Sequence, residues 1–172
     1  MAATLSRRTF LKAGLLGALA LATAGGIYRA TRSTAPLSPY LLDEKAQSAL
    51  RAIASALLQG TMPASADAVN AQVARVQIAI GGLPLTTQKE IQDLFGLLVL
   101  GPTRRFLAGI PDDWDKAKRE DVAAFLQNWR THRLGLLQSA YHALHDLVIG
   151  PWYADASNWA AIGYPGPIKE LS

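Results

Sequence analysis

The 172-residue sequence contains no cysteine. This absence excludes disulfide bonds, iron–sulfur clusters held by thiolates, covalent c-type haem and zinc sites built from cysteine. The patterns G-x-G-x-x-G, G-x-x-x-x-G-K-[ST] and G-x-S-x-G are missing as well. The chain therefore lacks the glycine-rich turns that bring backbone close to a dinucleotide or phosphate, and the tight turn that exposes a nucleophilic serine.

Most of the chain also lacks an excess of charge of one sign. The formal net charge is +4. However, three of the 17 basic residues, Arg7, Arg8 and Lys12, lie in the first 24 positions, which contain no acidic residue. This leaves 14 basic residues against 13 acidic ones in the rest of the chain. Such a near balance removes the electrostatic basis for binding nucleic acid.

The first residues carry the features of an export signal. Residues 6–12 read S-R-R-T-F-L-K, and an apolar stretch rich in alanine follows them. The adjacent Arg7 and Arg8 offer a receptor two planar, permanently charged groups, and Phe10 and Leu11 supply an apolar flank. This order is typical of a twin-arginine signal, so we predict that the twin-arginine translocase exports the chain.

The apolar stretch over 13–24 is short for a permanent membrane anchor. Spanning a bilayer as a helix takes about 20 apolar residues, and this stretch has roughly a dozen. The small residues Ala22 and Ala24 suit a signal peptidase. We therefore predict a signal peptide over 1–24, cleavage after Ala24, a spacer over 25–40 and a periplasmic location. An uncleaved leader that tethers a membrane-bound scaffold is the alternative.

The body of the chain, residues 41–150, is predicted to be a small all-α bundle of about five helices. Apolar residues recur at helical spacing, and this periodicity predicts helices over 46–57, 69–80, 87–98, 122–129 and 134–148. In the second of these, the β-branched run 76–80 leaves a short strand as an alternative. Trp114 and Trp129 are expected in the core.

Caps and breakers predict where several of these helices begin and end. Thr87 to Glu90 reads as a capping box at the start of the third helix. Gly101–Pro102 and Gly150–Pro151 are expected to end the third and the fifth helix. The acidic residues Asp112, Asp113 and Asp115 precede the fourth helix and would suit its positive N-terminal end.

Residues 151–172 are expected to form an irregular C-terminal arm. Two glycines and two prolines in 163–167 force turns, and four aromatic residues fall within thirteen positions. Tyrosine and tryptophan offer large apolar area at little cost in rotamer entropy, and proline restricts the backbone in advance. We predict a partner interface made of Trp152, Tyr153, Trp159, Tyr164, Pro165 and Pro167. A strap packed on the bundle is the alternative.

Few other residues point to chemistry. His142 and His145 stand three positions apart with Asp146 beside them, a spacing that could present two imidazoles to one metal ion. Because no third ligand is evident, we predict no metal site, no catalytic residue and no cofactor in this chain. A self-contained periplasmic metal-binding protein or enzyme that uses these three residues is the alternative function.

Four segments together resemble one protein family. They are the leader over 6–12, G-P-T-R-R-F-L-A-G over 101–109, the stretch from Trp129 to His145 that contains L-L-Q-S-A-Y-H-A-L-H, and W-Y-A-D followed by N-W-A-A-I-G-Y-P-G-P over 152–167. The chain resembles the gluconate 2-dehydrogenase subunit 3 family, the small (gamma) subunits of membrane-associated, FAD-dependent sugar and alcohol dehydrogenases. The resemblance covers most of the chain and is most specific in its last forty residues.

The resemblance implies a function that belongs to a complex. In that family the small subunit carries the twin-arginine signal, and a large flavoprotein of the glucose–methanol–choline type carries FAD and the substrate site. A multihaem cytochrome c subunit often completes the complex, which is associated with the inner membrane. The resemblance thus implies a non-catalytic escort that supports export, maturation and assembly of its partner. Some relatives carry cysteines, and their absence here rules out a disulfide link to a partner.

Overall fold

The computed structural model describes residues 42–166 of the chain. These residues form six α-helices and two single-turn 3₁₀ helices, with no strand among them, so the predicted all-α bundle is confirmed. The strand alternative for 76–80 is wrong, because these residues lie inside a helix. The predicted signal peptide and the spacer, with Arg7, Arg8, Phe10, Leu11, Ala22 and Ala24, lie outside the described residues.

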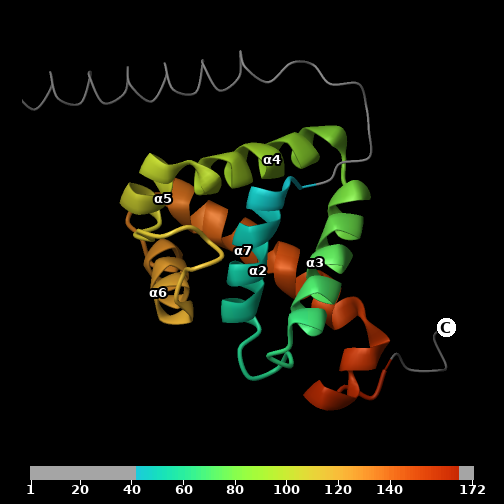
Figure 1. Ribbon diagram of the computed structural model, residues 1–172. Helices are drawn as coiled ribbons and strands as arrows, with labels where there is room; N and C mark the ends of the chain where they lie inside the picture. The colour runs from blue at the N-terminus through green and yellow to red at the C-terminus, as the bar shows by residue number, and fades with distance from the viewer. Residues whose placement is uncertain (1–41, 167–172) are drawn as a thin grey trace, which may run out of the picture. The chain divides into compact units, whose positions relative to one another are not determined.

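Helix α2 (Glu44–Leu57) occupies the centre of the bundle. It packs against α3 (Ala66–Gly81), α4 (Leu85–Val99), α6 (Arg119–Arg130) and α7 (Gly135–Ala154). Figure 1 shows α2 crossing the middle of the bundle, with α3 on one side, α6 on the other and α4 across one end. Four residues on the face of α2 toward the core are fully buried, namely Ala49, Leu50, Ile53 and Ala54.

Side-chain caps begin the first two helices of the bundle. Asp43 Oδ1 accepts a hydrogen bond from Ala46 N at 2.8 Å, and Ser65 Oγ accepts one from Ala68 N at 3.2 Å. Each bond satisfies a backbone N–H that has no partner within its helix. A short polar residue just before the apolar stripe thus determines where each of these two helices, α2 and α3, begins.

The capping box predicted over Thr87–Glu90 is wrong, although the helix is present. Helix α4 begins at Leu85, directly after Pro84, and has no side-chain cap. Gln88 instead turns back, and its Nε2 donates to the carbonyls of Leu83 at 2.8 Å and Gly81 at 3.2 Å. The fixed backbone angle of proline favours an earlier start, which leaves the expected box inside the helix.

Gly101–Pro102 begins a helix that the sequence pattern did not predict. Helix α4 stops at Val99, Leu100 is extended, and a short helix, α5 (Gly101–Leu107), follows at once. Pro102 lies in the first turn of α5, where a missing N–H has no helical acceptor to lose. The same two residues therefore mark an end and a start.

The acidic cluster does not lie at the start of the fourth predicted helix. That helix, α6, begins at Arg119 and has Glu120 and Asp121 in its own first turn. Asp113 instead forms an ion pair with Arg104 of α5. The hydrogen bond from Arg104, together with its charge, lowers the pKa of Asp113. The predicted role of Asp112, Asp113 and Asp115 at the helix dipole is therefore wrong.

The predicted end of the last helix at Gly150–Pro151 is also wrong, because α7 continues through Pro151 to Ala154. Proline cannot donate to the carbonyl four residues earlier, so Leu147 O receives no helical bond from position 151. Trp152 is only 4% exposed, and its burial anchors the extra turn to the bundle. The boundary between bundle and arm thus falls after Ala154.

Candidate functional site

The C-terminal arm folds back on the end of α7 as an ordered element. Two 3₁₀ turns, η1 (Ala156–Asn158) and η2 (Ala160–Ile162), follow α7 directly. Asp155 Oδ1 accepts from Ser157 N at 2.9 Å and from Ser157 Oγ at 2.7 Å. Asn158 Nδ2 donates to Trp152 O at 2.9 Å. Side chains next to the turns therefore hold their backbone.

One ion pair joins the arm to the bundle. Arg75 of α3 approaches Asp155 to 2.5 Å between Nη2 and Oδ2. The hydrogen bonds from Ser157 lower the pKa of Asp155, and the positive charge of Arg75 lowers it further. The ionised carboxylate is thus the form that the folded arm prefers.

Three aromatic residues organise the rest of the arm. Trp159 Nε1 donates to Tyr153 O at 2.7 Å, and Tyr164 N donates to Trp159 O at 2.9 Å. The rings of Trp159 and Tyr164 meet edge to face, with centroids 5.2 Å apart. Gly163 and Gly166 both have positive φ, and a Cβ at Gly166 would lie 3.3 Å from the indole of Trp159. Glycine is therefore required at this turn.

The predicted interface residues fall into two groups. Trp152 is buried in the core of the bundle, so its side chain is not on the surface. Tyr153 and Tyr164 are each 46% exposed, Trp159 is half-buried and Pro165 is exposed. Pro167 lies outside the described residues. The structure thus brings Tyr153, Trp159 and Tyr164 together on one ordered element and separates Trp152 from them.

The histidine pair lies on the solvent side of α7. His142 is exposed, and His145 Nδ1 lies 3.0 Å from Oδ1 of its neighbour Asp146. The ring of Tyr141 packs near both imidazoles, with centroids 5.4 and 5.8 Å away. Within residues 42–166, no three His, Cys, Asp or Glu side chains are grouped so that they could hold a metal ion.

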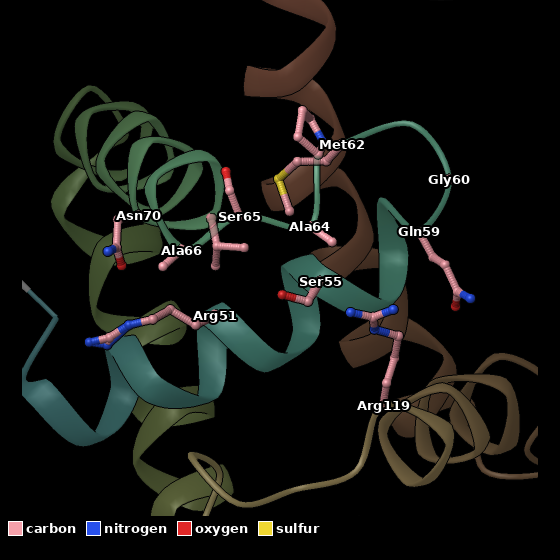
Figure 2. A pocket seen from close by; sticks show the side chains of 12 residues that line it. Arg51, Ser55, Gln59, Gly60, Met62, Ala64, Ser65, Ala66, Asn70 and Arg119 are labelled. Atoms are coloured by element: carbon pink, nitrogen blue, oxygen red, sulfur yellow. The ribbon is translucent and has the colours of Figure 1, made fainter.

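A surface hollow of about 470 Å³ lies where α2, α3 and α6 meet. Figure 2 shows Ser55 on α2, Asn70 on α3 and the side chain of Arg119 reaching from the start of α6 toward α2. Arg51, also in the lining, is paired with Glu44 at 2.6 Å. The lining is exposed or half-buried apart from Met62, so we assign no ligand to this hollow.

A second, smaller hollow of about 310 Å³ contains the buried cation of the bundle. Arg104 is 7% exposed; its Nη1 donates to Asp113, and its Nε has no partner within the described part of the chain. Lys45 and Asp115 also line this hollow. The hollow thus holds one ion pair, between Arg104 and Asp113, with the exposed Lys45 and Asp115 at its edge.

Sequence reasoning missed two buried polar residues, Arg104 and Gln72. Gln72 of α3 is fully buried, and its Nε2 donates to Val148 O of α7 at 2.8 Å. It stands three positions after Val69, so the helical period already placed it on the inward face. The predicted core tryptophans are confirmed: Trp114 Nε1 donates to Leu98 O at 2.9 Å, and Trp129 Nε1 donates to Leu107 O at 3.0 Å.

Comparisons with protein-family models, with curated proteins and with solved structures found no match. Among the described residues, no helix is long and apolar enough to cross a membrane.

Proposed function

We propose that this chain is the non-catalytic small subunit of a flavin-dependent sugar or alcohol dehydrogenase. It escorts a large subunit of the glucose–methanol–choline type, which carries FAD and the substrate site, through twin-arginine export. It then remains with this flavoprotein in the periplasm, and a multihaem cytochrome c subunit is a further partner. The observation that carries the proposal is the arm: the segment with the most specific resemblance has an ordered backbone and exposed tyrosine rings.

The geometry of the arm suits a docking element. Its backbone is already held by Asp155 and by the indole of Trp159, so a partner would order few additional residues. Tyr153 and Tyr164 each expose a ring with a terminal hydroxyl, which can bury apolar area and donate a hydrogen bond. These properties support contact with a large, folded partner.

The assignment of FAD and catalysis to the large subunit follows from the residues that this chain has and lacks. The chain has no glycine-rich turn for a pyrophosphate, so FAD is assigned to the large subunit. No observation favours the metal-binding alternative, because the described residues bring no third ligand to His142 and His145. Catalysis is therefore proposed for the partner alone.

A pull-down with the tagged flavoprotein tests the proposal. The full chain is co-expressed with it, unchanged or with Tyr153→Ser and Tyr164→Ser together. An aromatic anchor is typically worth about 2 kcal/mol, so loss of both rings should weaken association by about a thousandfold. The matched control is Leu85→Ser, which removes another exposed apolar side chain from the start of α4.

Conservative variants separate docking from folding. Tyr153→Phe with Tyr164→Phe keeps both rings and should retain most of the association. Circular dichroism should show the same helix content in all variants, because both tyrosine rings are exposed. Full recovery of the serine variant with the flavoprotein would contradict the assigned interface. Failure of the unchanged chain to associate would contradict the function itself.

A further inference from the structure

One end of the bundle exposes large apolar side chains. Phe106 at the end of α5 is 89% exposed, and Leu136 in the first turn of α7 is 80% exposed. Leu100, Leu107 and Leu134 are exposed beside them in the chain. Most apolar side chains of this size lie in the core, so a group of five in two short segments stands out. We call these five residues the apolar end.

Hydrogen bonds bring the two segments of the apolar end together. The indole of Trp129, at the end of α6, donates to the carbonyl of Leu107. The turn after Trp129 is compact, because His132 N donates to Trp129 O at 3.3 Å and Leu134 N donates to His132 Nδ1 at 3.1 Å. Figure 1 shows α5 and the start of α7 at the same end of the bundle. The backbones of the two segments therefore lie at the same end of the bundle.

The stretches of sequence that contain the apolar end have arginine as their only charged residue type. Residues 94–111 and 122–145 contain four arginines and no acidic residue. Arg104 is buried and paired, whereas Arg105, Arg130 and Arg133 are exposed and have no salt bridge within the described residues. The nearest acidic residues along the chain are Asp93, Asp112, Asp121 and Asp146. Along the chain, the exposed leucine and phenylalanine side chains are thus flanked by three exposed arginines, and the one carboxylate that approaches α5, that of Asp113, is paired with Arg104.

We propose that the apolar end binds the surface of an anionic phospholipid membrane. Phe106 and Leu136 protrude from helix ends, and no residue of the apolar end lines either hollow described above. A fluid interface accepts protruding apolar side chains without a matching cavity, whereas a protein partner must supply one. Arginines close to the surface add attraction to anionic headgroups, and long basic side chains reach the headgroup region easily. This inference does not depend on the proposed dehydrogenase partner.

A local reporter tests the proposal in the full chain, which contains no cysteine of its own. Leu134→Cys places an environment-sensitive dye at the apolar end, and Ile78→Cys places it on α3, where the native side chain is 77% exposed. Figure 1 shows α3 on the side of the bundle away from α5. With vesicles of phosphatidylglycerol and phosphatidylethanolamine, the dye at 134 should shift to the blue and be quenched by lipid-borne quenchers. The dye at 78 should stay in water.

Charge and apolar contributions are separated by further variants of the Leu134→Cys chain. Phe106→Ser should weaken partitioning about tenfold, since burial of one phenylalanine is typically worth about that factor or more. Arg130→Gln with Arg133→Gln should weaken it by about the same factor, and high salt should remove this difference. Vesicles of phosphatidylcholine alone should bind far less.

Three results would overturn the proposal. The first is co-sedimentation of the chain with vesicles while the dye at 134 stays in water, because the leader would then be the contact. The second is a blue shift at 134 that rises with protein concentration without lipid, which would assign the apolar end to a second copy. The third is a blue shift produced by the flavoprotein in solution but not by vesicles, which would assign it to that partner.

Discussion

At the scale of single residues, buried polar side chains connect distant parts of this fold. Gln72 and Val148 are 76 positions apart in the chain and share a buried hydrogen bond. Arg104 is buried and reaches an exposed carboxylate, Asp113, in the following loop. Removing Asp113 would leave a desolvated cation without its partner, which typically costs more than replacing the cation itself by an apolar side chain.

These residues also show the limit of reading single positions from a sequence. Trp114 and Trp129 were predicted in the core correctly, because large aromatic residues near an apolar stripe are seldom left outside. Gln72 and Arg104 were missed, because only the folded chain shows which carbonyl or carboxylate satisfies each of them. The exposure of Phe106 was missed for a different reason, because the apolar character of a side chain by itself predicts burial.

Asp155 gives the arm a dependence on pH. Its folded-state pKa lies below the ordinary value of 3.8, so its stabilising contribution is complete above that value and is lost as the pH falls through the folded-state pKa. We expect the arm to loosen at acidic pH, with a smaller change in Asp155→Asn, whose side chain does not ionise. The indole N–H resonance of Trp159, which donates to Tyr153 O, reports the change by NMR as the pH is lowered from neutral to well below 3.8.

The matched control for Asp155 is Asp146→Asn. Asp146 is exposed on α7, and among the described residues its side chain has a hydrogen bond or ion pair with its neighbour His145 alone. This variant should follow the unchanged chain at every pH. An equal pH response of Asp155→Asn and the unchanged chain would show that Asp155 does not control the arm.

At the scale of helices and turns, periodicity predicted which segments are helical, and local signals misplaced several ends. Glycine and proline end a helix only where no tertiary packing favours its continuation. At Pro151 the burial of Trp152 holds one more turn of α7, whereas at Pro102 the missing N–H falls in a first turn and helps a helix begin. At Pro151, tertiary packing decided where the helix ends. A short stretch of sequence does not show which residues will pack against it.

The continuation of α7 makes the arm divisible at a defined point. A chain that ends at Ala154 keeps Trp152 and should remain folded, although it loses association with the flavoprotein. A chain that ends at Pro151 loses a buried tryptophan, so its free energy of unfolding should fall by about 3–5 kcal/mol. Urea titration of the two truncated forms measures the difference. Equal stabilities would place Trp152 in the arm after all.

At the scale of the whole molecule, the fold class and the proposed roles depend on different parts of the chain. The all-α class is confirmed, while the leader and Pro167 lie outside the described part of the chain. The proposed export role therefore depends on residues 6–12, and the docking role depends on an arm that the structure describes. A partner cannot be deduced from one chain in the way a core can, because the side chains that would satisfy its interface belong to another molecule.

The export role has a direct test in cells. Replacing Arg7→Lys and Arg8→Lys keeps both charges but removes the planar groups that a receptor can bind at two points. We expect this subunit and its flavoprotein to stay in the cytoplasm, with dehydrogenase activity retained inside the cell. Cell fractionation followed by activity assay and immunodetection of the flavoprotein measures this outcome.

The control for the export test is Arg29→Lys with Arg32→Lys in the predicted spacer, which should leave export unchanged. A flavoprotein that reaches the periplasm at its normal level despite the altered leader would refute the escort role. The chain could then act only after export.

The central position of α2 also bears on when the chain can fold during its synthesis. The fully buried face of α2, around Leu50 and Ile53, is covered by α6 and α7, which the ribosome makes some 70 to 100 residues later. The hydrogen bond from Gln72 likewise waits for Val148. In a nascent chain, α3 and α4 can therefore cover only part of α2 until α6 and α7 have emerged, and folding before that point would leave part of the core open to water. Closure of the core is thus a property of the complete set of bundle helices, and no intermediate of synthesis that lacks α7 can reach it.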